Sequence, residues 1–76
     1  MMLKINQAVK EYGMCRSRFY QDIADGLMVR PVRMGERARL VPADELRAII
    51  RARIAEKPEA EIKALVQKLH AGRQSI

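Results

Sequence analysis

Arginine is the commonest basic residue of this 76-residue chain. Its planar guanidinium can hold a phosphate or the edge of a guanine base through two parallel hydrogen bonds. Fifteen Lys and Arg stand against nine Asp and Glu, which gives a net charge of +6. The excess is concentrated, because residues 27–41 contain four arginines and one acid, and a further pair, Arg16 and Arg18, lies upstream. This clustering predicts a polyanionic partner, with nucleic acid as the leading candidate.

Other residues that could carry chemistry are few and isolated. Cys15 is the only cysteine, so neither an intramolecular disulfide nor a Cys-rich metal site can form, and we expect it to be a small buried residue. His70, the only histidine, is expected to interact with the C-terminal end of a helix dipole. No Ser, His and Asp grouping and no glycine-rich phosphate loop occurs in the sequence. We therefore expect that the protein is not an enzyme and that it binds neither a cofactor nor a metal ion.

The N-terminal residues and the overall hydropathy bear on location. The first positions carry charge and contain no apolar run of signal-peptide length. No stretch approaches the roughly 20 apolar residues that a membrane-spanning helix needs. These features favour a cytoplasmic protein, and a DNA partner would place it at the bacterial nucleoid.

Glycine and proline divide the chain into five short segments, of which the first two are predicted helices. The first helix is expected to follow Asn6 as its N-cap and to end at Gly13 after about two turns. The second is expected to begin within residues 15–17 and to end at Gly26. Only a tight turn would separate them.

The next segment has a different pattern. Apolar residues alternate with a period near two and predict a β-hairpin over residues 28–41, with a break at Gly35. Arg37 and Arg39 would then share one strand face. Pro31 fits only an edge strand, because its nitrogen cannot donate to a strand ladder.

Two longer helices are predicted downstream of the hairpin. The third should begin near Pro42, and its buried stripe should extend to Ile54. The fourth should follow Pro58 and present one apolar face over the residues up to 72. Residues 73–76 are expected to be a frayed tail, with Arg73 as a solvated charge.

These elements predict a mainly helical fold with a small β-hairpin. Their order is that of a winged helix-turn-helix, in which the second helix enters the major groove of DNA and a basic hairpin flanks it. Residues 1–56 would form this domain, and residues 57–72 an additional C-terminal amphipathic helix. That helix could pack on the domain or mate with a second copy of the chain, and the sequence leaves both alternatives open.

Several ordered features resemble those of AlpA-type prophage regulators and related excisionases. They are the run Gly13-Met14-Cys15-Arg16-Ser17-Arg18-Phe19-Tyr20, the pair Asp25-Gly26, and the run Arg30-Pro31-Val32-Arg33-Met34-Gly35. The resemblance covers residues 3–54 and implies a winged helix-turn-helix with a DNA-binding domain of the MerR type. The family often has serine where this chain has Cys15, a poor cap, so Ser17 could cap the second helix instead.

The resemblance implies two groups of DNA-binding residues. The recognition helix is expected to present Arg16, Ser17, Arg18, Tyr20 and Gln21, and the wing is expected to present Arg30, Arg33, Arg37 and Arg39. Arg16 and Arg18 are candidates for guanine edges and Gln21 for adenine, whereas Ser17 and Tyr20 suit phosphate. Tyr20 could equally pack its ring on the helix pair.

The implied function is sequence-specific binding of double-stranded DNA by a protein of a phage or other mobile element. It would act as a transcriptional regulator or as an excisionase, a recombination directionality factor that bends DNA. A module of this size needs more than one copy for high specificity, so we expect self-association, with residues 59–71 as the natural surface. An integrase or RNA polymerase would be a further partner. The alternative is a protein-interaction adaptor that binds an integrase and has incidental DNA affinity.

Overall fold

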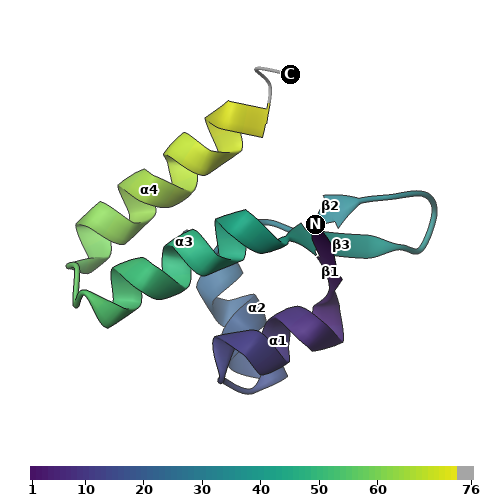
Figure 1. The fold of residues 1–76 in the computed structure, drawn as a ribbon, viewed down its shortest axis with the longest axis horizontal. Helices are drawn as coiled ribbons and strands as arrows, with labels where there is room; N and C mark the ends of the chain where they lie inside the picture. The colour runs from purple at the N-terminus through teal and green to yellow at the C-terminus, as the bar shows by residue number, and fades with distance from the viewer. Residues whose placement is uncertain (74–76) are drawn as a thin grey trace.

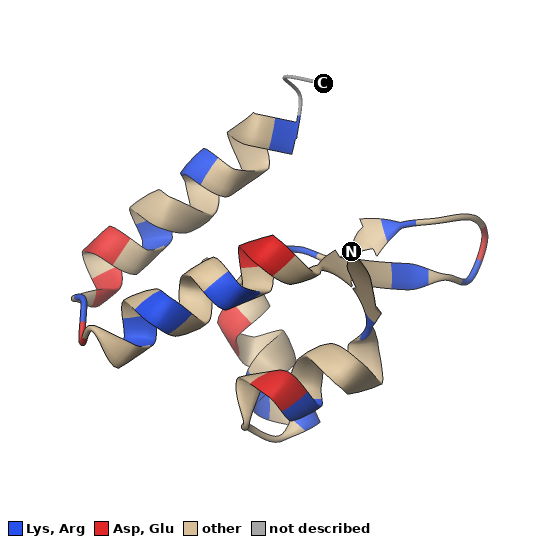
Figure 2. Cartoon of the chain, in the orientation of Figure 1, with Lys and Arg blue, Asp and Glu red and all other residues tan. Residues whose placement is uncertain are grey.

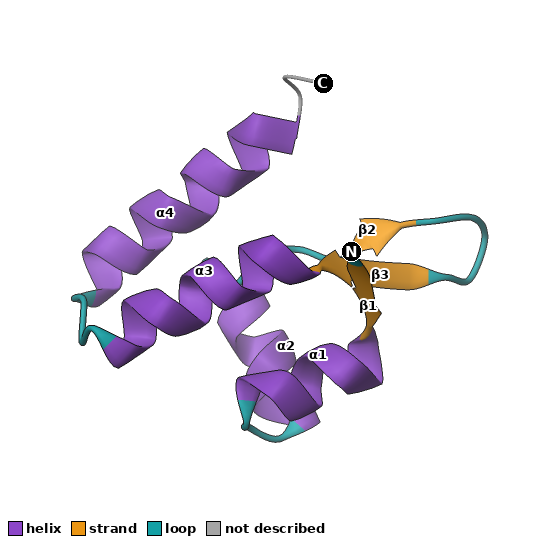
Figure 3. Cartoon of the chain, viewed as in Figure 1, coloured by secondary structure: helices purple, strands orange, loops and turns teal. Residues whose placement is uncertain are grey.

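Glycine or proline lies at several of the helix ends. A computed structural model describes residues 1–73, which form four helices and a three-stranded antiparallel sheet (Figure 1, Figure 3). In chain order the elements are β1 (Met2–Lys4), α1 (Ile5–Tyr12), α2 (Arg16–Ala24), β2 (Val32–Arg33), β3 (Arg39–Pro42), α3 (Ala43–Ile54) and α4 (Glu59–Gly72). The prediction of a mainly helical chain with a small hairpin is therefore confirmed.

Two glycines end the first two helices, as predicted. Gly13 has φ +80° and its N–H donates to the carbonyl groups of Val9 and Lys10. Gly26 has φ +78°, and the N–H that follows it, from Leu27, donates to the carbonyl of Asp22 at 2.8 Å. Glycine suits both positions because a left-handed backbone costs it little, and this closure satisfies the last carbonyl groups of each helix.

The starts of α1 and α2 differ from the prediction. The N-cap of α1 is Lys4 instead of Asn6, and its backbone N–H donates to Oε1 of Gln7 at 3.0 Å. Asn6 lies inside the first turn, because the preceding residues are drawn into strand β1. The N-cap of α2 is Cys15, so the expectation of a cap at Ser17 is wrong. Cys15 is also exposed rather than buried, since it lies in the tight turn between α1 and α2.

The sheet has one more strand than the predicted hairpin. Strand β3 lies in the centre, with Leu3 of β1 opposite Val41 and Val32 of β2 opposite Leu40. β1 was not predicted, because three residues carry too little periodicity to indicate a strand. The hairpin is confirmed in part and extends away from the helices (Figure 1).

The strands of the hairpin are shorter than residues 28–41. Met28 and Val29 are fully buried in the loop before β2, because their side chains enter the core instead of a ladder. Pro31 precedes β2 and lies outside the sheet. Arg37 lies in the hairpin loop, so the expectation that Arg37 and Arg39 share a strand face is wrong.

One hydrophobic core joins the four helices with β1, β3 and the loop before β2. Its buried members are Leu3, Ala8, Phe19, Leu27, Met28, Val29, Val41, Ala43, Leu46, Ile49, Ile62 and Val66. Ile54 is 75% exposed, against the prediction, because it lies about 80° around α3 from buried Leu46 and nothing covers it there. Ile62 and Val66 belong to α4, so in this structure the apolar face of the last helix packs on its own chain.

The end of α4 is fastened to the loop that enters the hairpin. Nε2 of His70 accepts the backbone N–H of Arg30 at 3.1 Å, and the guanidinium of Arg73 donates to the Arg30 carbonyl at 2.8 Å. Arg73 also forms an ion pair with Glu45 of α3. The expectation of a solvated tail charge at Arg73 is therefore wrong, and the rest of that predicted tail, residues 74–76, lies outside the described residues.

Substitution at two isoleucines tests the packing of α4. Ile62→Ala should lower the free energy of unfolding by about 2–5 kcal/mol, because it empties a buried site. Ile54→Ala, the same change at an exposed position, should alter it by at most about 0.5 kcal/mol. Urea unfolding followed by circular dichroism measures both. Equal effects of the two substitutions would show that α4 does not belong to the core.

The histidine contact predicts a pH dependence of stability. Desolvation, aided by the charges of Arg73 and Arg30, lowers the pKa of His70, whereas Glu45 acts in the opposite direction. The pKa is about 6.5 in an unfolded chain, so the unfolded state binds more protons below that pH. The contribution of His70 to stability should thus be present above pH 6.5 and be lost as the pH falls through the folded-state pKa.

Unfolding curves at pH 7.5 and 5.5 measure this loss. His70→Gln keeps an acceptor near the position of Nε2 and cannot titrate, so its stability should fall less over the same interval. Because the chain has one histidine, the difference between the two proteins reports on that residue alone. An identical pH dependence of wild type and variant would contradict the account of the contact.

Candidate nucleic-acid interface

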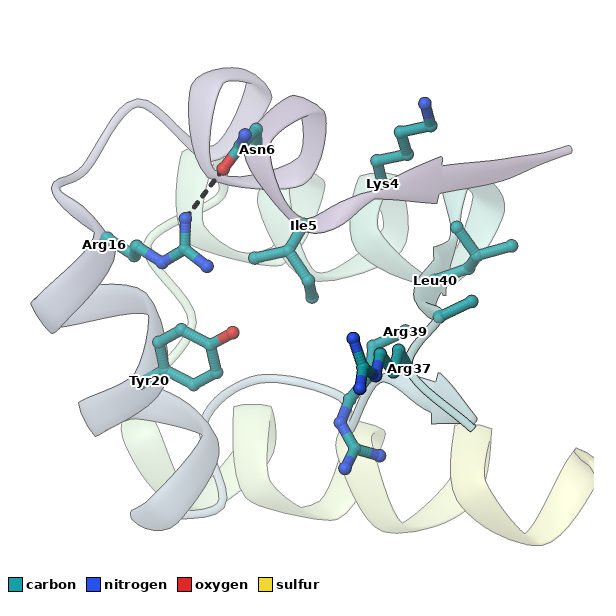
Figure 4. A pocket seen from close by; sticks show the side chains of 9 residues that line it. Lys4, Ile5, Asn6, Arg16, Tyr20, Arg37, Arg39 and Leu40 are labelled. Atoms are coloured by element: carbon teal, nitrogen blue, oxygen red, sulfur yellow. Dashed lines mark hydrogen bonds between the residues drawn. The ribbon is translucent and has the colours of Figure 1, made fainter. Parts of the chain in front are cut away.

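A groove of about 480 Å³ lies between the start of α2 and the β2–β3 hairpin, with the β1–α1 junction as its third wall (Figure 4). It is lined by Lys4, Ile5, Asn6, Arg16, Tyr20, Arg37, Ala38, Arg39 and Leu40. Four of these residues are cationic and none is acidic. In a chain with nine carboxylates this segregation creates a locally positive concave surface.

Arg16 and Tyr20 bring α2 to this groove. They are four residues apart and therefore lie on the same side of the helix, one turn from each other. The guanidinium carbon of Arg16 is 5.9 Å from the centroid of the Tyr20 ring, and Nη1 of Arg16 donates to Oδ1 of Asn6 at 2.7 Å. Arg37 and Arg39 occupy the opposite wall (Figure 4). One predicted recognition-helix arginine and two predicted wing arginines thus line the same groove.

Arg18 lies on the other side of α2. Its Nε donates to Oδ1 of Asp22 at 3.0 Å, and it lines a separate small pocket with Tyr12, Met14 and Arg53. Residues two positions apart in a helix are separated by about 200° around its axis, which explains why Arg16 and Arg18 do not share a surface. The predicted pair of base readers is therefore separated, and only Arg16 faces the groove.

Asp22 is the one buried charged residue in residues 1–73, and it is only 2% exposed. Its carboxylate accepts the hydroxyl of Tyr12 from α1 and Nε of Arg18 from α2, and Nη2 of Arg53 from α3 lies 3.9 Å away. Burial and the neighbouring carboxylate raise the pKa of Tyr12. The hydrogen bond to Asp22 likewise raises the pKa of Arg18. This cluster joins three helices, and we call it the Asp22 cluster.

The other predicted recognition-helix residues lie on the exposed face of α2. Ser17 is exposed in the first turn, and Gln21 is exposed one turn later, where its amide donates to Oδ1 of Asp25 at 3.1 Å. Tyr20 is 42% exposed, and its ring also meets Phe19 edge to face. Both readings of Tyr20, packing and ligand contact, are thus compatible with its position.

The remaining wing residues are less central. Arg33 of β2 is exposed and lies opposite Arg39 in the sheet, outside the groove lining. Arg30 lies before the hairpin, where its backbone is held by α4. Of the four arginines predicted for the wing, the structure therefore brings Arg37 and Arg39 to the groove.

Sequence reasoning missed two polar groove residues, Lys4 and Asn6. Lys4 lies at the rim and points away from the centre (Figure 4). Neither has a signal in the sequence, because each reaches the groove only through β1 and its pairing with β3. Asn6 was expected to cap α1, and its side-chain Oδ1 instead accepts a hydrogen bond from Nη1 of Arg16, ten residues away.

Comparisons with protein-family models, with curated proteins and with solved structures found no match. Residues 1–73 contain no group of three or more His, Cys, Asp or Glu side chains placed to hold a metal ion. Within the same residues every helix is too short or too polar to cross a bilayer. The groove and its charges are thus the features from which a function can be argued.

The Asp22 cluster predicts a stability effect at one aspartate. Asp22→Asn should lower the free energy of unfolding by about 1–3 kcal/mol, because a buried site loses charge-assisted hydrogen bonds. Asp25→Asn, at an exposed position in the adjoining turn, should change it by at most about 0.5 kcal/mol. Thermal unfolding compares the two variants. An Asp22→Asn protein as stable as Asp25→Asn would show that the cluster does not hold the helices together.

Proposed function

We propose that this protein binds double-stranded DNA in a sequence-specific manner as a winged helix-turn-helix. In this proposal α2 enters the major groove and the β2–β3 hairpin follows the flanking backbone. The observation that carries the proposal is the acid-free groove, in which Arg16 faces Arg37 and Arg39. A phosphodiester chain is an anionic ligand of the right shape for such a surface, because it is narrow, extended and uniformly charged.

The order of the elements supports the same assignment. α1 and α2 are separated by a turn at residues 13–15, and a β-hairpin and a further helix follow, as in the winged arrangement. The exposed face of α2 presents Ser17, Tyr20 and Gln21, whose polar groups can meet base edges or phosphates. Arg18, engaged by Asp22, is better suited to holding the helix than to reading bases.

The resemblance to AlpA-type regulators and excisionases suggests the biological setting. Both kinds of protein would use the same DNA-facing surface, one to control a promoter and the other to bend DNA for an integrase. A neighbouring integrase gene would favour the excisionase role. Self-association through residues 59–71 has less support from the structure than from the sequence, because Ile62 and Val66 of that helix are buried in the chain's own core.

DNA binding can be tested with four arginine variants. A preferred duplex is first selected from a random pool, and dissociation constants are then measured over a range of salt concentrations. Arg16→Ala should cost about 1–3 kcal/mol at the preferred site and relax its sequence preference. Arg37→Ala or Arg39→Ala should weaken all duplexes alike and reduce the salt slope by about 1.

Arg51→Ala is the matched control. It removes an exposed arginine from α3, outside the groove, and therefore the same net charge. It should leave the sequence preference unchanged. If wild type showed no preference between the selected duplex and random DNA, an adaptor that binds another protein would replace the proposal.

A further inference from the structure

The guanidinium of Arg16 is held in place by the protein itself. Nη1 donates to Oδ1 of Asn6 at 2.7 Å, and the group lies over the ring of Tyr20. Within residues 1–73 it makes no other hydrogen bond, so Nε and Nη2 are left for an outside acceptor. The close view shows this arrangement on one wall of the groove (Figure 4).

Asn6 is placed by regular secondary structure. Asn6 lies in the first turn of α1 and Arg16 is the first residue of α2, and the two helices are joined at their far ends by Tyr12 and Asp22. The distance between the Asn6 amide and the start of α2 is thus set by the helix pair and not by a loop. An arginine that is already hydrogen-bonded within the free protein loses less rotamer freedom on binding a ligand than an unrestrained arginine does.

We propose that Asn6 is a positioning residue that orients Arg16 toward a guanine edge. The preference of the site for guanine then depends on Asn6 even though Asn6 need not contact DNA. The inference rests on the proposed function and deepens it. O6 and N7 of guanine are two acceptors at the spacing of a guanidinium edge, and no other base presents that pair in the major groove. With Nη1 engaged by Asn6, the Nε and Nη2 edge is the pair of donors that remains.

A double-mutant cycle on DNA binding tests the proposal. Asn6→Ala should weaken binding to the selected duplex by about two- to tenfold and reduce discrimination against a guanine-to-adenine change at one position. In an Arg16→Ala background the same substitution should have less than about a twofold effect, because its target is gone. Gln67→Ala, which removes an exposed amide from α4, is the control and should have no effect in either background.

A second measurement needs no DNA. Rotation of the Arg16 guanidinium about its Cζ–Nη bonds can be followed by nuclear magnetic resonance of the free protein. It should be faster in Asn6→Ala than in wild type and unchanged in Gln67→Ala. Thermal unfolding verifies that each variant is folded, which we expect because Asn6 is exposed and alanine favours a helix.

The outcomes separate this inference from the proposed function. Equal losses of affinity from Asn6→Ala in both backgrounds would mean that Asn6 contacts DNA itself. No loss of affinity would mean that the hydrogen bond between Asn6 and Arg16 does not contribute to binding. Either result overturns the positioning role and leaves the proposal of DNA binding intact. Slower or unchanged rotation of the guanidinium would overturn it as well. If wild type preferred no duplex over random DNA, the proposed function would be overturned, together with the assignment of Arg16 to a guanine edge.

Discussion

A single buried carboxylate constrains the arrangement of the N-terminal helices. Asp22 is almost inaccessible to solvent, and it receives hydrogen bonds from Tyr12 and Arg18 while Arg53 lies close by. A buried charge is tolerated only where such partners surround it, so the angle between α1 and α2 has little freedom. The groove depends on that angle, because Asn6 on one helix must meet Arg16 on the other. Removal of the carboxylate would thus loosen a surface that it does not touch.

The opposite side of the groove is held by a second set of contacts. α4 packs against α3 through Ile62 and Val66, and its end binds both backbone polar groups of Arg30 just before the hairpin. Four acids of the downstream half lie in the first turns of α3 and α4 (Figure 2), and one of them, Glu45, pairs with Arg73. Glu36, in the hairpin loop, is the one acid beside the hairpin arginines, and it does not line the groove.

The ends of several helices could be predicted from the sequence, but little of the pairing between distant segments could. Gly13 and Gly26 end helices because each adopts a left-handed backbone, which is a local requirement and could be predicted. β1, by contrast, exists only through pairing with β3, and the Arg73 to Glu45 ion pair spans 28 residues. In the candidate site the separation of Arg16 from Arg18 was predictable from helix periodicity. The burial of Asp22 was not, because an aspartate on a short helix is ordinarily solvent-exposed.

The central claim is that the groove between α2 and the hairpin is the surface that meets DNA. Titration of the ¹⁵N-labelled protein with a duplex selected from a random pool tests it most directly. The account predicts that backbone amide signals of Arg16, Tyr20, Arg37 and Arg39 shift together, while that of Gln67 on the outer side of α4 does not move. Shifts confined to α4, or signals that respond identically to random and selected duplexes, would contradict it.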